Sequence, residues 1–239
     1  MQNYVGNLSE FQLGVDGKMT ARITCPDKAI PAPGQYLLAH APEDTDAPLA
    51  TVLYPTEKSP SSSRSYGSFI AAPPIPSTWQ LGTTLHLRGP LCKGFRLPSS
   101  IRNLALVSLS DTPTRLLPLL AHADNTALFL SINNQPLTIN HLQLAPSLEI
   151  NPLSELPAAL QWADFLALDL PLERLPDLPK LLGLPQDRYL PCSAQALILT
   201  PMPCGGLADC GVCAVTTGKR YQLACKDGPV FDLKDIFTS

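Results

Sequence analysis

The chain has 239 residues, of which 45% are hydrophobic and 15% charged, enough to form two modest domains and a small additional unit. A net charge of −3, without a run of basic residues, argues against nucleic acid as a partner. No apolar stretch approaches the length of a membrane span, and residues 1–19 lack the pattern of a secretory signal. We therefore expect a cytoplasmic protein whose weakly charged surface is covered by a partner.

The first segment, residues 1–98, is predicted to form a β barrel. Short apolar or alternating runs are separated by turns rich in Gly, Pro and Ser, the pattern of consecutive strands. Several such strands at short intervals favour a small barrel or sandwich. The expected strands are 19–25, 35–41, 47–55, 65–73 and 83–91.

The second segment, residues 99–200, alternates between strand and helix patterns. A buried-strand run at 104–110 is followed by a helical pattern at 112–123, and later strands and helices continue the alternation. Such alternation is typical of a parallel sheet with crossover helices. The further expected elements are strands at 126–133, 164–171 and 195–201 and helices at 154–163 and 172–183.

The third segment, residues 201–239, contains four of the seven cysteines. It is too short to fold by apolar burial alone, so we expect an inorganic centre to hold it. Only one Cys-x-x-Cys pair is present and no histidine, which disfavours zinc. The spacing matches the plant-type [2Fe–2S] pattern C-x₄-C-x₂-C…C except for one extra residue between the first two cysteines. The prediction is a [2Fe–2S] site, with structural zinc, free thiols or disulfides as the alternatives.

Three stretches of this chain resemble the electron-transfer subunit of the heterotetrameric (class 1B) dihydroorotate dehydrogenases. They are "CGGLADCGVCAV…ACKDGPVFDLKDI" (204–236), "GPLCKGFRLP" (89–98) and "PGQYLL" (33–38). The resemblance implies a ferredoxin-reductase-like barrel at 1–98, a Rossmann-like domain at 99–200 and a [2Fe–2S] lobe at 201–239. It also implies FAD, and electron transfer between a nicotinamide nucleotide and the FMN of a catalytic barrel subunit. By this match the cluster ligands would be Cys204, Cys210, Cys213 and Cys225.

The nucleotide-binding loop departs from the family pattern. A dinucleotide site needs glycines in its first strand-to-helix turn, but no glycine lies between Gly94 and Gly183. The turn reads Ser-Leu-Ser-Asp-Thr at 108–112, and Asp111 there would occupy the helix end that should attract a phosphate. NAD(P) binding is therefore predicted to be lost.

The flavin motif is altered as well. The family places an Arg-x-x-Ser-type motif on a barrel strand, and the matching stretch 49–58 has neither residue in place. Tyr54 in this stretch is the candidate for stacking on FAD, although a barrel-filling role is the stronger interpretation. FAD is retained as a candidate cofactor, although these residues disfavour it. The other cysteines, Cys25, Cys92 and Cys192, are isolated and are expected to be inert buried thiols.

The sequence thus predicts a divergent iron–sulfur electron-transfer subunit in a hetero-oligomer. It would pass electrons between an external carrier and a catalytic flavoprotein, a dihydroorotate dehydrogenase-like barrel in pyrimidine biosynthesis by the resemblance. The alternative is a structural or regulatory subunit of a flavoenzyme complex, with zinc or nothing at the four cysteines.

Overall fold

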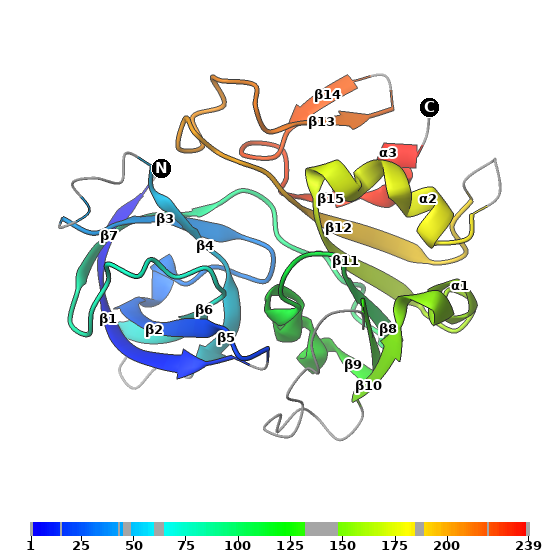
Figure 1. Ribbon diagram of the computed structural model, residues 1–239, viewed down its shortest axis with the longest axis horizontal. Helices are drawn as coiled ribbons and strands as arrows, with labels where there is room; N and C mark the ends of the chain where they lie inside the picture. Colours follow the sequence, from blue (N-terminus) through cyan, green and yellow to red (C-terminus); the bar gives the residue numbers. More distant parts are fainter. Residues whose placement is uncertain are drawn as a thin grey trace.

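The computed structural model describes residues 2–14, 16–42, 44, 49–59, 65–131, 148–184, 189–218 and 220–237. Its two main bodies are an antiparallel barrel and a mainly parallel sheet, and a small hairpin unit lies against both (Figure 1). The predicted β barrel plus α/β fold class is confirmed. Among the described residues no helix is long and apolar enough to cross a membrane.

The barrel is one seven-stranded sheet in the order β4-β3-β7-β1-β2-β6-β5. β4 and β5 are two parts of a single run interrupted only at Tyr54, so the two ends of the sheet meet there. The carbonyl oxygen of Tyr54 accepts a hydrogen bond from the N–H of Ala72, 2.8 Å away, beside the β5–β6 pairing. The strands are β1 (Asn3–Leu13), β2 (Met19–Pro26), β3 (Tyr36–His40), β4 (Thr51–Leu53), β5 (Pro55–Ser59), β6 (Tyr66–Ala71) and β7 (Thr84–Leu91), with the 3₁₀ turn η1 (Asp27–Ala29) after β2.

The second sheet has the order β10-β9-β8-β11-β12-β15. All neighbouring pairs are parallel except β12 with β15, which is antiparallel. Counted along the chain this is the order 3-2-1-4-5-6, that of the Rossmann fold. The strands are β8 (Ile101–Ser108), β9 (Ala123–Leu130), β10 (Leu148–Pro152), β11 (Phe165–Pro171), β12 (Ser193–Leu199) and β15 (Val230–Asp232).

The crossover helices are shorter and tighter than the sequence pattern predicts. The helix expected at 112–123 is a 3₁₀ helix that contains Pro118, and the others last one or two turns. Proline has no N–H and its ring collides with the preceding turn, so each proline interrupts the α-helical hydrogen bonds. The elements are η2 (Thr114–His122), η4 (Leu153–Glu155), α1 (Leu156–Ala159), η5 (Leu172–Asp177), α2 (Leu178–Leu181) and, at the end, α3 (Leu233–Phe237).

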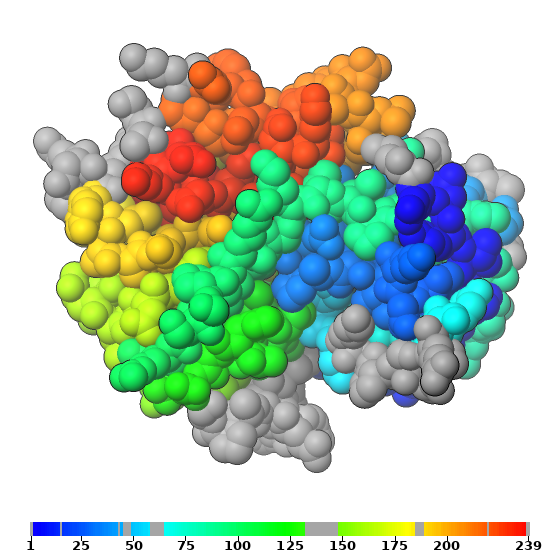
Figure 2. All heavy atoms as spheres, turned by 180° about the vertical axis from the view of Figure 1, so that it is seen from behind, coloured from blue at the N-terminus to red at the C-terminus, as the bar shows by residue number. Residues whose placement is uncertain are grey.

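The hairpin β13 (Ala214–Thr217) and β14 (Arg220–Leu223) forms the third unit, between β12 and β15. One continuous apolar core joins all three units, because Tyr36, Leu38 and Leu91 of the barrel cluster with strands of the second sheet and with Cys213 and Cys225. The space-filling view shows the segment after β7 crossing the surface from the barrel to the second sheet (Figure 2). The hairpin unit is therefore held by its neighbours on two sides.

Candidate iron–sulfur site

The loop that carries the first three cysteines winds through four residues in the left-handed region. Gly205, Gly206 and Gly211 have φ values of 60°, 73° and 70°, and Ala208 has 62°. Glycine adopts this conformation without steric strain, so the loop can turn repeatedly with its N–H groups facing inward. These three glycines thus shape the loop.

The fourth cysteine comes next to the third through the β13–β14 hairpin. β13 begins directly after Cys213, and β14 ends two residues before Cys225. The N–H of Ala224 donates to the carbonyl oxygen of Cys213 across the open end of the hairpin, at 2.9 Å. An Asp227 carboxylate caps the turn by accepting from the N–H of Leu223, also at 2.9 Å. Local pairing thus joins cysteines separated by eleven residues.

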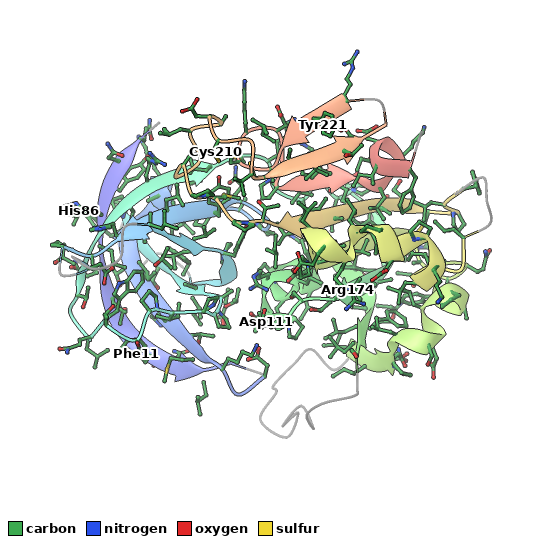
Figure 3. The ribbon with its side chains drawn as sticks, turned by 45° about the horizontal axis from the view of Figure 1, so that its top comes forward. Phe11, His86, Asp111, Arg174, Cys210 and Tyr221 are labelled. Atoms are coloured by element: carbon green, nitrogen blue, oxygen red, sulfur yellow. The ribbon has the colours of Figure 1, made fainter. Side chains whose placement is uncertain are left out.

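The four cysteines interact electrostatically in two pairs, Cys204 with Cys210 and Cys213 with Cys225. Cys204 is also close enough to influence Cys225 electrostatically. Cys210 is exposed, Cys204 is half-buried, and Cys213 and Cys225 are buried (Figure 3 labels Cys210 at the edge of the barrel). None of the seven cysteines forms a disulfide.

Backbone N–H groups point at these sulfurs. The N–H groups of Asp209, Cys210 and Leu207 bond to Cys204 and lower its thiol pKa to about 6. The N–H of Ala208 bonds to Cys225, but burial outweighs it, and together with Cys213 raises the pKa of the Cys225 thiol to about 12. N–H groups directed at thiolate sulfur are a main determinant of the potential of iron–sulfur centres.

Four cysteines are the donor set that a [2Fe–2S] cluster takes, with two thiolates on each of its two irons. Within the described part of the chain, no group of three or more Cys, His, Asp or Glu side chains is arranged to hold a metal ion. That the four cysteines together bind a cluster therefore stays a prediction.

Tyr54, the predicted flavin contact, lies buried between the barrel and the second sheet. Its ring is 5.8 Å from that of Tyr36, tilted by 54°, and the Arg115 guanidinium lies 5.9 Å from its centre. Burial raises the pKa of the Tyr54 hydroxyl. The described surroundings of the ring are therefore side chains of this chain, and whether it contacts FAD stays a prediction.

Arg115 fills the place where a nucleotide would bind in a Rossmann fold. Ligands of such sheets bind outside the carboxyl ends of the strands, where the strand order reverses, here between β8 and β11. The Arg115 guanidinium lies there and donates to Asp169 Oδ2 at 3.2 Å and to the carbonyl oxygen of Pro73 at 3.1 Å. It also approaches Asp111 to 3.5 Å, and Asp111 pairs with Lys18 of the barrel at 2.9 Å.

This ion pair is almost completely shielded from solvent. The Asp169 side chain is 0% exposed and that of Arg115 is 6% exposed. Burial raises the pKa of Asp169 to about 6, although Arg115 opposes the shift. One carboxylate oxygen of Asp169 and Nε of Arg115 have no hydrogen-bond partner. The contact brings together residues 54 positions apart, and no local sequence pattern indicates it.

The sequence family described as the iron–sulfur cluster binding domain of dihydroorotate dehydrogenase B matches residues 201–237. The predicted resemblance is thereby confirmed. The carboxyl-terminal segment is thus similar to the iron–sulfur domain of dihydroorotate dehydrogenase B. The match covers only this segment, and the first two segments depart from the family pattern in their nucleotide and flavin motifs. A comparison with curated proteins found no match.

Solved structures resemble the whole fold. An NADH-dependent reduced ferredoxin–NADP oxidoreductase, studied for flavin-based electron bifurcation, has a TM-score of 0.66 at 15% identity over 96% of this chain and 88% of its own. A ferredoxin–NADP⁺ reductase from Neisseria gonorrhoeae with bound FAD and NADP has a TM-score of 0.56 at 12% identity, over 83% and 99%. The ferredoxin reductase of carbazole 1,9a-dioxygenase has 0.54 at 16%, over 78% and 65%. At these identities the likeness establishes a ferredoxin-reductase-like fold, to which a segment similar to the iron–sulfur domain of dihydroorotate dehydrogenase B is joined.

Proposed function

We propose that this chain is an electron-transfer subunit that binds one [2Fe–2S] cluster through Cys204, Cys210, Cys213 and Cys225. The observation that carries the proposal is that the four cysteines lie in a segment that matches an iron–sulfur domain, with backbone N–H groups directed at Cys204 and Cys225. When bound, the cluster supplies a carrier of one electron at a time. The chain supplies the thiolates, the N–H groups directed at them and the shielding of the site.

The four proposed ligands differ in burial, so one side of the site faces the core and the other faces solvent. Cys213 and Cys225 lie in the continuous core, whereas Cys210 is exposed beside Leu207 and Val212, which are 61% and 50% exposed. A partner that covers the exposed side would bring its own redox group within reach of the centre. We propose that this partner is a catalytic flavoprotein, a dihydroorotate dehydrogenase-like barrel in a cytoplasmic hetero-oligomer.

The carboxyl ends of β8 and β11 differ in this proposal from a nucleotide-binding site. Arg115 is engaged by Asp169 and Pro73, so its guanidinium is not available to a phosphate. Tyr54, which lies beside Arg115, packs against Tyr36. We therefore propose that NAD(P) does not bind at the ends of β8 and β11, that FAD is disfavoured there, and that the external carrier exchanges electrons elsewhere.

The test is metal analysis of anaerobically purified protein. We expect two irons and two acid-labile sulfides per chain and a brown protein whose visible absorption bleaches on reduction. Cys213→Ser should abolish the iron content, and Cys192→Ser, which changes a half-buried thiol outside the hairpin unit, should retain it. Colourless protein with stoichiometric zinc would refute the assignment. FAD in the supernatant of heat-treated complex would refute its proposed absence.

One observation favours a second candidate, a structural or regulatory subunit. The buried Arg115–Asp169 pair joins η2 to β11, and Arg115 also donates to the carbonyl oxygen of Pro73 in the barrel segment. Such a link between the two bodies is expected of a structural subunit. Such a subunit would bind zinc or no metal at its four cysteines. If the Cys213→Ser variant no longer forms the complex with the partner, the structural role is favoured. If the complex persists and only electron transfer stops, the electron-transfer role is favoured.

A further inference from the structure

Cys92 stands in a strained backbone conformation next to the proposed cluster site. It follows β7 directly and has φ 66°, one of only two described non-glycine residues with positive φ. A side chain in this region costs roughly 1 kcal/mol or more relative to glycine, and such strain persists only where surrounding contacts maintain it. The contacts of the Cys92 thiol and backbone therefore hold the residue in this conformation.

The Cys92 thiol bonds to the residue that would be the fourth cluster ligand. Its S–H donates to the carbonyl oxygen of Cys225, with sulfur and oxygen 2.8 Å apart. The Tyr36 hydroxyl lies 3.7 Å from the same sulfur. Because the thiol donates to Cys225, the hydroxyl is the donor in this second contact. A fully buried tyrosine, a thiol and the ligand peptide thus form one hydrogen-bonded row.

The same tyrosine reaches the opposite end of the cysteine loop. A Cβ built on Gly206 would lie 3.3 Å from the Tyr36 hydroxyl oxygen, so this oxygen packs directly against the loop between Cys204 and Cys210. Tyr36 thus packs against the loop between Cys204 and Cys210, and Cys92 bonds to the backbone of Cys225. Neither residue belongs to the segment that matches the iron–sulfur domain.

The backbone next to Cys92 is hydrogen-bonded to the turn after Cys225. The N–H of Lys93 donates to the carbonyl oxygen of Gly228 at 2.7 Å, and Lys93 forms a β bridge with Pro229. The Gln35 side-chain amide donates to the carbonyl oxygen of Cys92 at 2.9 Å. These bonds hold the strained residue so that its thiol must face Cys225.

Building on the proposed function, we propose that Cys92 is a positioning residue for the cluster: its thiol hydrogen bond holds the peptide of Cys225 and so keeps the Cys225 thiolate oriented for the cluster. It is not itself a ligand. Partners that orient a metal-binding residue typically contribute 10- to 100-fold to metal retention. Under this proposal Cys92, which the sequence predicts to be an inert thiol, has a positioning role.

Three substitutions separate the thiol from the backbone strain. Cys92→Ser keeps a donor, Cys92→Ala removes it and keeps the strained backbone, and Cys92→Gly removes both. Iron loss to an excess of chelator, followed anaerobically by the bleaching of visible absorption, should be at least about 10-fold faster for Cys92→Ala and Cys92→Gly. We expect Cys92→Ser to stay within about threefold of the parent protein. Cys192→Ala is the matched control and should leave the rate unchanged.

A second readout needs no cluster. In metal-free full-length protein, the alkylation rate of Cys225, measured by mass spectrometry, should rise at least about 10-fold in Cys92→Ala, because the 4% exposed Cys225 loses its anchor. If the parent protein binds no iron, the proposed function fails and this measurement alone decides on Cys92. The proposal is overturned if Cys92→Gly matches the parent protein, or if Cys92→Ser behaves like Cys92→Ala. Melting temperatures of all variants exclude unfolding as the cause.

Discussion

Replacement of Arg115 by methionine tests the buried ion pair at the ends of β8 and β11. Methionine fills most of the apolar volume of arginine but removes the guanidinium, which lies 3.2 Å from Asp169 Oδ2 and 3.1 Å from the Pro73 carbonyl oxygen. Asp169, which is 0% exposed, would then be a buried carboxylate without its cation. Breaking a buried pair from one side destabilises a protein strongly, because the remaining charge stays desolvated.

The expected loss is about 3–5 kcal/mol of unfolding free energy at neutral pH. For a chain of this size that corresponds to a fall in melting temperature of about 6–20 °C. The loss should shrink at lower pH, because protonation of Asp169 removes the unpaired charge. Replacing both partners, Arg115→Met with Asp169→Leu, should recover most of the stability, since no buried charge is left.

The measurement is thermal unfolding of cluster-loaded protein under anaerobic conditions, followed by circular dichroism. Arg174→Met is the matched control: Arg174 pairs with Asp177 at 3.0 Å, but their side chains are 46% and 61% exposed. Exposed pairs contribute at most about 1 kcal/mol, so this variant should melt within about 4 °C of the parent protein. If Arg115→Met also melts within that range, the interpretation of Arg115 as an interdomain anchor is wrong.

Two further predictions concern pH and packing. Since the pKa of Asp169 is raised to about 6 in the folded state from a usual 3.8, it favours folding below about pH 4 and loses this contribution as pH rises through 6. The unfolding free energy of metal-free protein relative to Asp169→Asn should thus fall by up to about 3 kcal/mol between pH 4 and pH 7, and a pH-independent difference would contradict the raised pKa. Gly34→Ala should destabilise the fold by about 1–3 kcal/mol more than Gly82→Ala, as judged by chemical denaturation. Both glycines have positive φ, but only at Gly34 would a Cβ collide, 2.6 Å from Val230 Cγ2, so equal losses would show that packing there is loose.

The strand and crossover pattern could be predicted in part. Alternating runs in the first segment identify β2, β3, β4, β6 and β7, and buried runs identify β8, β9, β11 and β12. The longest strand, β1, has no such signal, because six of its eleven residues are exposed and two of these, Val5 and Leu13, are apolar. It exists because β2 and β7 pair with it on both sides, which is a tertiary condition. The helical patterns were predicted too long because their prolines interrupt α-helical hydrogen bonding.

The cysteine site could be predicted from the sequence more fully than the contacts of Arg115 at the ends of β8 and β11. Its spacing and its glycines are local features, and the hairpin that pairs Cys213 with Cys225 is also local. The partners of Arg115 are not local: Asp169 and Pro73 lie 54 and 42 positions away. The helical pattern around Arg115 suggests only an amphipathic helix, on which an arginine would be expected to face solvent.

From the sequence alone it follows that four cysteines and three glycines lie within one short segment, and that strand and helix patterns alternate before it. Spacing, periodicity and turn residues are read along the chain, and they suffice for these features. Only the tertiary structure decided that Cys92 bonds to Cys225, 133 positions away, and that Arg115 occupies the end of the parallel sheet. Such contacts follow from the packing of the barrel against the sheet, and packing brings together residues that no local pattern relates.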